Sequence, residues 1–156
     1  MSKKYYTLNV EIPDGKDIDF DKSTLKNIVF KDIVTIKWNN INNAIEIDCD
    51  GEHFLLSAEI PAAMCNWHDA KRYCDEYGYS DEWHLPSKEQ LLIIAKHINK
   101  INNIIKENGG FELDRTSWYW ADAKDDVNYA PCVTMDRTIG GDIVEHYHLA
   151  RPIAYL

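Results

Sequence analysis

The sequence predicts an α+β fold, and three observations lead to this prediction. Short runs of β-branched and apolar residues, separated by turn residues, fill the chain up to residue 57. Two segments in the middle, residues 66–78 and 87–98, place apolar side chains at helical spacing. Short strand-like runs then return from residue 118 to the end. Strands, then helices, then strands is the order of an α+β protein.

The length of the chain and its net charge limit the kinds of function that the protein can have. The 156 residues are enough for one domain with a buried core. Seventeen basic and 26 acidic residues give a net charge of −9, which repels phosphate backbones, so no nucleic-acid partner is expected. No run approaches the ~20 apolar residues of a membrane span. The N-terminus lacks the apolar core of a signal peptide. We therefore expect a soluble, cytoplasmic protein that does not associate with membranes.

The N-terminal segment is expected to be a small β extension. Apolar and polar residues alternate over residues 6–12 with the period of a strand, and a β-branched run covers residues 33–38. Between these runs, aspartates crowd residues 14–21. A calcium loop needs a glycine after its acidic ligands and a closing glutamate, so a solvated acidic loop is the better interpretation. We divide the chain into the extension, residues 1–43, and a main domain, residues 44–156.

Strands are expected on both sides of the helices. Residues 45–47 and 54–57 flank Asp50-Gly51, a dipeptide that is typical of hairpin turns. After the two main helices, the pattern predicts a short third helix at residues 101–105. It then predicts strands at residues 118–120, 129–135, 143–149 and 153–155. A turn at Gly140-Gly141 is expected to join strand 129–135 to strand 143–149.

Both main helices carry signals at their ends. Asn66 is a good N-cap for the first helix, and Gly78 suits its C-terminus because glycine readily adopts the left-handed conformation. Ser87 and Gln90 have the spacing of a capping box at the start of the second helix. Residues 91–98 are apolar on most of the helix circumference, which predicts a buried helix.

The order of several motifs resembles a known family. The motifs are, along the chain, the aromatic-led helix with Trp67, Ala70 and Cys74, the WHLPS sequence at residues 83–87 with Glu89 and Leu91, then Gly109-Gly110, Tyr119-Trp120 and Arg151-Pro152. Together they are similar to the bacterial C-type lectin-like domains of the Fibrobacter-major-paralogous and Lcl C-terminal type. Those domains are related in fold to formylglycine-generating enzymes and to the variable proteins of diversity-generating retroelements. The resemblance covers Cys49 to Leu156.

The resemblance implies two main helices packed on twisted antiparallel sheets, with the N-terminal and C-terminal strands adjacent. It also implies a ligand-binding module more than an enzyme. The chain departs from the calcium-dependent lectins, because it has neither their Glu-Pro-Asn or Gln-Pro-Asp triplet nor their Trp-Asn-Asp triplet. Formylglycine-generating enzymes need two reactive cysteines late in the chain, where this sequence has only Cys132. We therefore expect no cofactor and assign no catalytic residue.

Cysteines and histidines have alternative interpretations. The four cysteines lack metal-ligand spacing and are expected to be buried small hydrophobes, and whether any of them pair stays open. Cys65, just before the first helix, is the nearest candidate for a catalytic thiol. His146 and His148, with Asp142 or Glu145 beside them, have the donor types of a zinc site. Two histidines on a solvated strand face are the commoner arrangement, so no metal is expected.

Candidate ligand-binding residues gather in the last third of the chain. They are Trp118, Asp122, Asp125, Asp126, Tyr129, Arg137, His146 and His148. Aromatic side chains beside carboxylates can stack on a sugar ring and bind its hydroxyls, or they can anchor a protein partner. Tyr119 and Trp120 are expected in the core, with Trp118 at its edge. Arg151 is expected to form an ion pair with an acidic residue of the helices.

These observations favour a non-catalytic module that recognises a protein or carbohydrate ligand through its C-terminal loops, residues 122–129 and 136–148. Two alternatives stay open. One is an enzyme related to the formylglycine-generating branch, with Cys132 or a metal on His146 and His148 as its working part. The other is a structural or assembly protein, a homo-oligomer held together by the N-terminal extension.

Overall fold

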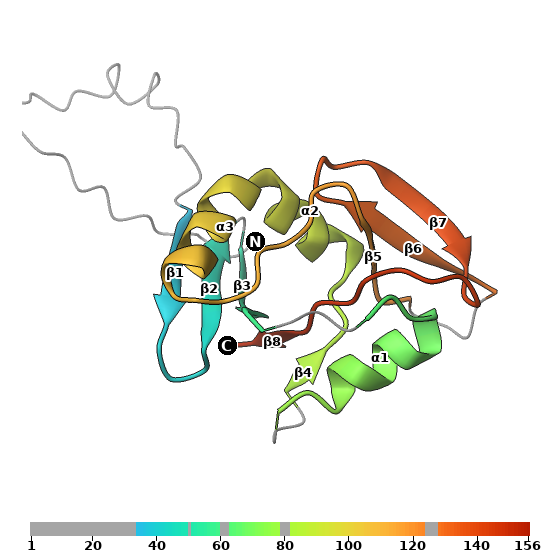
Figure 1. Cartoon of the computed structure of the whole chain (residues 1–156), viewed down its shortest axis with the longest axis horizontal. Helices are drawn as coiled ribbons and strands as arrows, with labels where there is room; N and C mark the ends of the chain where they lie inside the picture. The colour runs from blue at the N-terminus through green and yellow to red at the C-terminus, as the bar shows by residue number, and fades with distance from the viewer. Residues whose placement is uncertain (1–33, 50, 60–62, 79–81, 124–127) are drawn as a thin grey trace, which may run out of the picture. The chain divides into compact units, whose positions relative to one another are not determined.

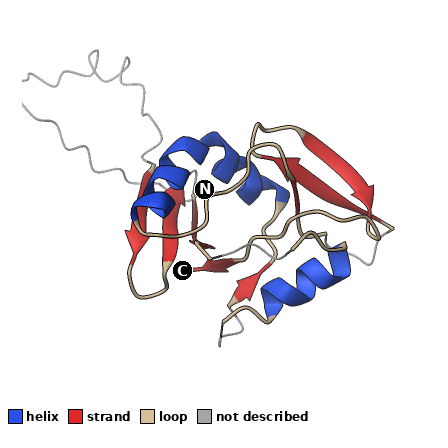
Figure 2. Cartoon of the chain, in the orientation of Figure 1, coloured by secondary structure: helices blue, strands red, loops and turns tan. Residues whose placement is uncertain are grey.

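The computed structural model describes residues 34–49, 51–59, 63–78, 82–123 and 128–156 (Figure 1). The chain from Asp32 to Leu156 makes one compact unit. Within its described residues, three helices and two antiparallel sheets confirm the predicted α+β class (Figure 2). The strand predicted at residues 6–12 and the acidic loop that follows it lie outside the described residues.

The larger sheet has five strands in the order β1-β2-β3-β8-β4. These strands are β1 (Thr35–Asn39), β2 (Ala44–Cys49), β3 (Glu52–Ser57), β8 (Ile153–Tyr155) and β4 (Trp83–His84). The last strand of the chain lies between β3 and β4, with Leu56 opposite Ile153. The resemblance implied that the N-terminal and C-terminal strands are adjacent, and in the structure the C-terminal strand belongs to the same sheet as the N-terminal strands and pairs with the third of them, β3.

Strand β1 belongs to the same sheet as the rest of the domain. It pairs with β2 from Thr35, opposite Asp48, to Asn39, opposite Ala44. Its Ile36 is buried in the main core. The division that the sequence suggested between residues 43 and 44 thus falls in the turn between two paired strands.

The helices begin where their capping residues predict. Helix α1 spans Trp67–Asp75, and the Asn66 side chain accepts a hydrogen bond from the backbone N–H of Asp69. Helix α2 spans Lys88–Lys96, with both reciprocal bonds of the Ser87–Gln90 capping box present. Helix α3 spans Ile98–Glu107, so it is longer than the predicted third helix.

The smaller sheet has three strands in the order β5-β6-β7. They are β5 (Trp118–Trp120), β6 (Tyr129–Thr134) and β7 (Ile139–Ile143). The predicted turn at Gly140-Gly141 is wrong, because both glycines lie inside β7 and pair with β6. The chain turns instead near Asp136, whose carboxylate accepts hydrogen bonds from the Thr138 backbone N–H and hydroxyl. A side-chain-stabilised turn is an alternative to a glycine turn, and here it sets the strand register.

The two faces of the smaller sheet contribute to two of the three hydrophobic clusters among the described residues. Tyr119 and Val133, which are cross-strand partners, belong to the main core with β1–β3, α2 and α3. The next pair, Trp120 and Cys132, belongs to a second core with α1. Successive residues of a strand point to opposite faces, so one short sheet serves both cores. The expectation that Tyr119 and Trp120 are core residues is confirmed.

Candidate functional site

Two histidines converge on one aspartate at the end of β7. The Asp142 Oδ1 atom lies 2.7 Å from His146 Nδ1, and its Oδ2 atom lies 2.9 Å from His148 Nε2. Partial burial alone raises the pKa of the Asp142 carboxyl. Hydrogen bonds from the Ile143 backbone N–H, His148 and His146 outweigh that effect and hold the pKa below its ordinary value. The result is an ionised carboxylate held between two imidazoles.

The two histidines differ in how firmly the protein holds them. The His148 side chain is 12% exposed, whereas that of His146 is 57% exposed. The His148 backbone exchanges hydrogen bonds of 3.0 Å in both directions with Cys65. The His148 ring packs edge-on against buried Trp120, with ring centroids 4.4 Å apart. His148 is therefore oriented by the fold, and His146 is the accessible member of the pair.

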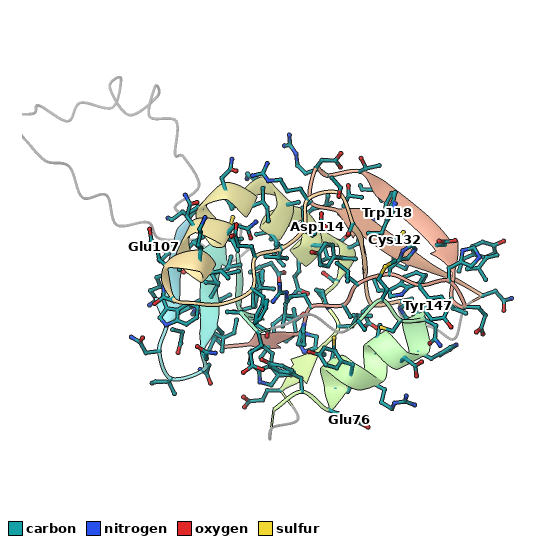
Figure 3. All side chains as sticks on the ribbon, viewed as in Figure 1. Glu76, Glu107, Asp114, Trp118, Cys132 and Tyr147 are labelled. Carbon is teal, nitrogen blue, oxygen red and sulfur yellow. The ribbon has the colours of Figure 1, made fainter. Side chains whose placement is uncertain are left out.

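Trp118 covers the backbone of β7 next to this cluster. An ideal Cβ atom added at Gly140 would lie 3.0 Å from two carbon atoms of the half-buried Trp118 ring. Glycine at this position therefore lets the indole lie close against the strand. In the view of Figure 3, Trp118 and Cys132 lie beside β7, with Tyr147 at the same end of the molecule. The prediction that Trp118 lies at the edge of the core is confirmed.

We call five residues the His–Asp surface: Trp118, Asp142, His146, Tyr147 and His148. The sequence named Asp142 only as a neighbour of the histidines, and it did not name Tyr147. Tyr147 is an exposed aromatic residue between the two histidines. An aromatic residue between two candidate histidines is a pattern from which Tyr147 could have been predicted as a site residue.

None of the other predicted site residues that the structure describes is hydrogen-bonded to the His–Asp surface. Tyr129 is exposed but lies opposite Ile143, so its side chain is on the sheet face opposite to that of Asp142. Arg137 lies in the turn before β7, with its backbone in the left-handed region at φ 75°. Asp122 contacts Lys71 of α1 at 3.4 Å. Asp125 and Asp126 lie outside the described residues.

Cys132 and Cys65, the two thiols considered as catalytic, lack the properties of nucleophiles. Burial and the nearby Asp142 raise the pKa of the Cys132 thiol to about 11. Burial and Asp69 likewise raise the pKa of Cys65. A reactive thiol needs the opposite shift, because the thiolate is the attacking species. None of the four cysteines forms a disulfide bond. In the described part of the chain, no group of three or more His, Cys, Asp or Glu side chains is placed to hold a metal ion.

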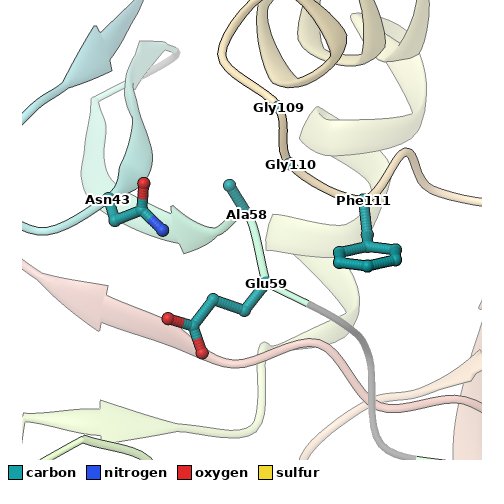
Figure 4. Close-up of a pocket in the computed structure, with 6 residues that line it drawn as sticks. All are labelled: Asn43, Ala58, Glu59, Gly109, Gly110 and Phe111. Carbon is teal, nitrogen blue, oxygen red and sulfur yellow. The ribbon is translucent and has the colours of Figure 1, made fainter.

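A pocket of about 260 Å³ lies elsewhere, between the end of β3 and the end of α3 (Figure 4). It is lined by Asn43, Ala58, Glu59, Gly109, Gly110 and Phe111. Beneath its rim, the Arg151 guanidinium donates to backbone carbonyls, among them those of Glu59 and Phe111. No residue of this pocket was predicted from the sequence.

The expected ion pair of Arg151 is wrong. Its side chain is fully buried and bonds the carbonyls of Ser57, Glu59, Phe111 and Glu112, and no acidic side chain is bonded to it among the described residues. Burial lowers the pKa of Arg151, and the neighbouring Tyr119 opposes that shift. Five guanidinium N–H groups can serve several carbonyls at once, which explains why an arginine occupies this position.

Comparisons with known proteins find likenesses among solved structures. No protein-family model matches the chain, and no curated protein matches it. Among solved structures, the crystal structure of botrocetin aligns with a TM-score of 0.44 and 10% sequence identity. The alignment covers 66% of this chain and 91% of botrocetin. Within the described residues, no helix has the length and apolar character needed to cross a membrane.

Proposed function

We propose that this chain is a non-catalytic ligand-binding module of the C-type lectin-like type, and that it recognises its ligand through the His–Asp surface. One observation carries the proposal. Asp142, a carboxylate with a lowered pKa, is held by His146 and His148 beside the half-buried ring of Trp118, and Tyr147, between the two histidines in the sequence, is exposed. Oriented polar groups next to aromatic rings are the usual elements of a recognition surface.

Each part of the His–Asp surface has a use in binding. The Asp142 carboxylate accepts hydrogen bonds from hydroxyl or amide groups of a ligand, beyond those it accepts from the histidines. The exposed His146 ring adds a polar contact with a known orientation. Trp118 and Tyr147 offer apolar faces that stack on a sugar ring or on a peptide side chain. Because His148 is held at both backbone and ring, part of this surface is ordered before the ligand arrives.

The chemistry of the thiols supports binding over catalysis. The enzyme alternative relied on Cys132, and the pKa of this thiol is raised to about 11, which keeps it protonated at neutral pH. The raised pKa of Cys65 has the same consequence. Asp142 has no hydroxyl or thiol nucleophile among its hydrogen-bond partners in the described residues. A binding module requires no such nucleophile.

The test is a pair of ligand screens with the full chain, one on a glycan microarray and one on a phage-displayed peptide library. We expect specific binders in one of the two screens. Trp118→Ala and Asp142→Asn should abolish that binding, whereas Ile41→Ala, at an exposed position in the β1–β2 turn, should retain it. Thermal unfolding of each variant checks that it is folded. Binders that tolerate both Trp118→Ala and Asp142→Asn would place recognition elsewhere, and two empty screens would contradict the proposal.

A further inference from the structure

The hydrogen bonds around Asp142 leave one of its acceptor positions for a ligand. An ionised carboxylate has about four acceptor positions on its two oxygens. The Oδ1 atom accepts from the Ile143 backbone N–H at 2.8 Å and from His146 Nδ1. Among the described residues, the Oδ2 atom accepts from His148 Nε2 alone. The Asp142 side chain is 30% exposed, so the remaining position on Oδ2 is available to a donor from outside the chain.

The exposed imidazole of His146 presents a second acceptor. A carboxylate without a proton cannot donate, so the His146 Nδ1 atom carries the hydrogen in its bond to Asp142. In the neutral ring the opposite nitrogen, Nε2, is then unprotonated and accepts. Among the described residues, this Nε2 atom has no hydrogen-bond partner. The carboxylate and the imidazole therefore both require donors on the ligand, whereas the Tyr147 hydroxyl can donate or accept.

The charge of this region favours a cation over a neutral donor. Glu145, in the turn between Asp142 and His146, is exposed and adds a second negative charge. In the part of the chain that the structure describes, no lysine or arginine forms an ion pair with either carboxylate. The whole chain has a net charge of −9, which attracts cations over longer distances. A neutral ligand gains nothing from this field.

Trp118 supplies an aromatic face next to the carboxylate. Its ring packs on Gly140, which lies two residues before Asp142 and on the same face of β7. The ring centroids of Trp118 and His148 are 6.4 Å apart. The face of an aromatic ring attracts an organic cation, and tryptophan attracts it most strongly. The aromatic ring and the carboxylate thus offer the two kinds of contact that hold such a cation.

We propose that the ligand binds the His–Asp surface through a cationic group with N–H donors, the guanidinium of an arginine or the ammonium of a lysine on a protein partner. This inference rests on the proposed function, because it names the chemistry that the same surface recognises. The cation lies against the Trp118 ring and donates to Asp142 Oδ2 and His146 Nε2. Lysine and arginine side chains are mostly exposed on proteins, which favours a protein as the source of this group. An amino sugar is the other source, and the test separates the two.

The test is a titration of the full chain at neutral pH, followed by proton–nitrogen correlation NMR. Two matched pairs of capped amino acids are the probes: arginine with citrulline, and lysine with Nε-acetyllysine. The second member of each pair keeps the length of the side chain but is neutral. We expect the arginine or lysine probe to shift the indole N–H signal of Trp118. Its neutral counterpart should bind about tenfold more weakly or less, because it loses a charge-assisted hydrogen bond. Glucosamine, a cationic sugar, should bind more weakly than the amino-acid cations.

Variants assign the binding to this surface. Asp142→Asn should weaken the binding of the cationic probes about tenfold, because it removes the charge but keeps a side chain of similar shape. Glu107→Gln removes one negative charge at an exposed position far from Tyr147 (Figure 3) and should retain the binding. Thermal unfolding checks that both variants are folded. Undiminished binding to the Asp142→Asn variant would overturn the inference.

Other outcomes separate this inference from the proposed function. Equal affinity for the charged and neutral members of both pairs would overturn the inference and leave the proposed function standing. The absence of any shift, together with binders in the ligand screens that depend on Trp118 and Asp142, would have the same meaning. Tighter binding of glucosamine than of arginine and lysine would overturn the protein partner in favour of a glycan. Two empty screens and no shift would contradict the proposed function as well.

Discussion

His148 and Cys65 exchange backbone hydrogen bonds of 3.0 Å in both directions, although one lies near the C-terminus and the other just before α1. The Trp120 indole N–H donates to the Cys65 carbonyl at 2.8 Å and its ring packs against His148. Two segments distant from His148 along the chain thus orient its imidazole toward Asp142. The His–Asp surface therefore depends on the packing of α1 and β5 as well as on its own residues.

Gly140→Ala should destabilise the protein by about 1–3 kcal/mol, the usual cost of overpacking. The added methyl group would lie 3.0 Å from the Trp118 ring and 3.4 Å from Cys132 Sγ, so the ring must move. Gly141→Ala is the matched control, because its nearest atom, the Ala130 carbonyl oxygen, is 3.7 Å away. Urea denaturation measures both changes. Equal effects of the two substitutions would contradict the close packing of Trp118 on β7.

Asp142→Asn should lower stability at neutral pH and much less in acid. The pKa of Asp142 is lowered in the folded protein from an ordinary value of 3.8. A lowered pKa stabilises the fold above the ordinary value, and this contribution is lost as the pH falls through the folded value. The difference in the free energy of unfolding between wild type and variant should therefore shrink as the pH falls below about 4. Denaturant titrations at several pH values measure this difference. A difference that does not change down to pH 3 would contradict the prediction.

The buried thiols should resist alkylation in the native protein. Burial raises the pKa of Cys74 and Cys132, so little thiolate forms near pH 8, and Cys49 is buried as well. Iodoacetamide should modify Cys65 slowly and the other three only in denaturant, as mass spectrometry of the intact chain would show. Cys65→Ala should remove the native labelling. Rapid native modification of Cys132 would contradict this prediction and reopen the enzyme alternative.

Arg151→Met should cost at least about 3 kcal/mol of unfolding free energy, because it leaves several buried carbonyls without a donor. The guanidinium donates to carbonyls on both sides of the pocket, including those of Ser57 and Phe111. Arg151→Lys keeps the charge but not the fork of donors, so it should recover only part of the loss. Chemical denaturation of both variants makes the comparison. A cost below about 1 kcal/mol for Arg151→Met would show that the carbonyls find other partners.

The predictions that the structure confirms depended on local signals. The Asn66 cap and the Ser87–Gln90 capping box involve residues three apart, so the sequence itself holds both partners. The prediction of a turn at Gly140-Gly141 was wrong because two local signals competed. The Asp136 side chain stabilised a turn five residues earlier than Gly141, and the glycines became strand residues under Trp118.

The sequence by itself determined the α+β class, the helix starts and the burial of Tyr119 and Trp120, because these follow from side-chain periodicity and from hydrogen bonds between near neighbours. Only the tertiary structure decided that Arg151 bonds carbonyls and that Tyr129 lies apart from the histidines. It also decided that His148 is held by Cys65 and Trp120. Such contacts join segments that are distant along the chain, and their partners are set by how the sheets and helices pack.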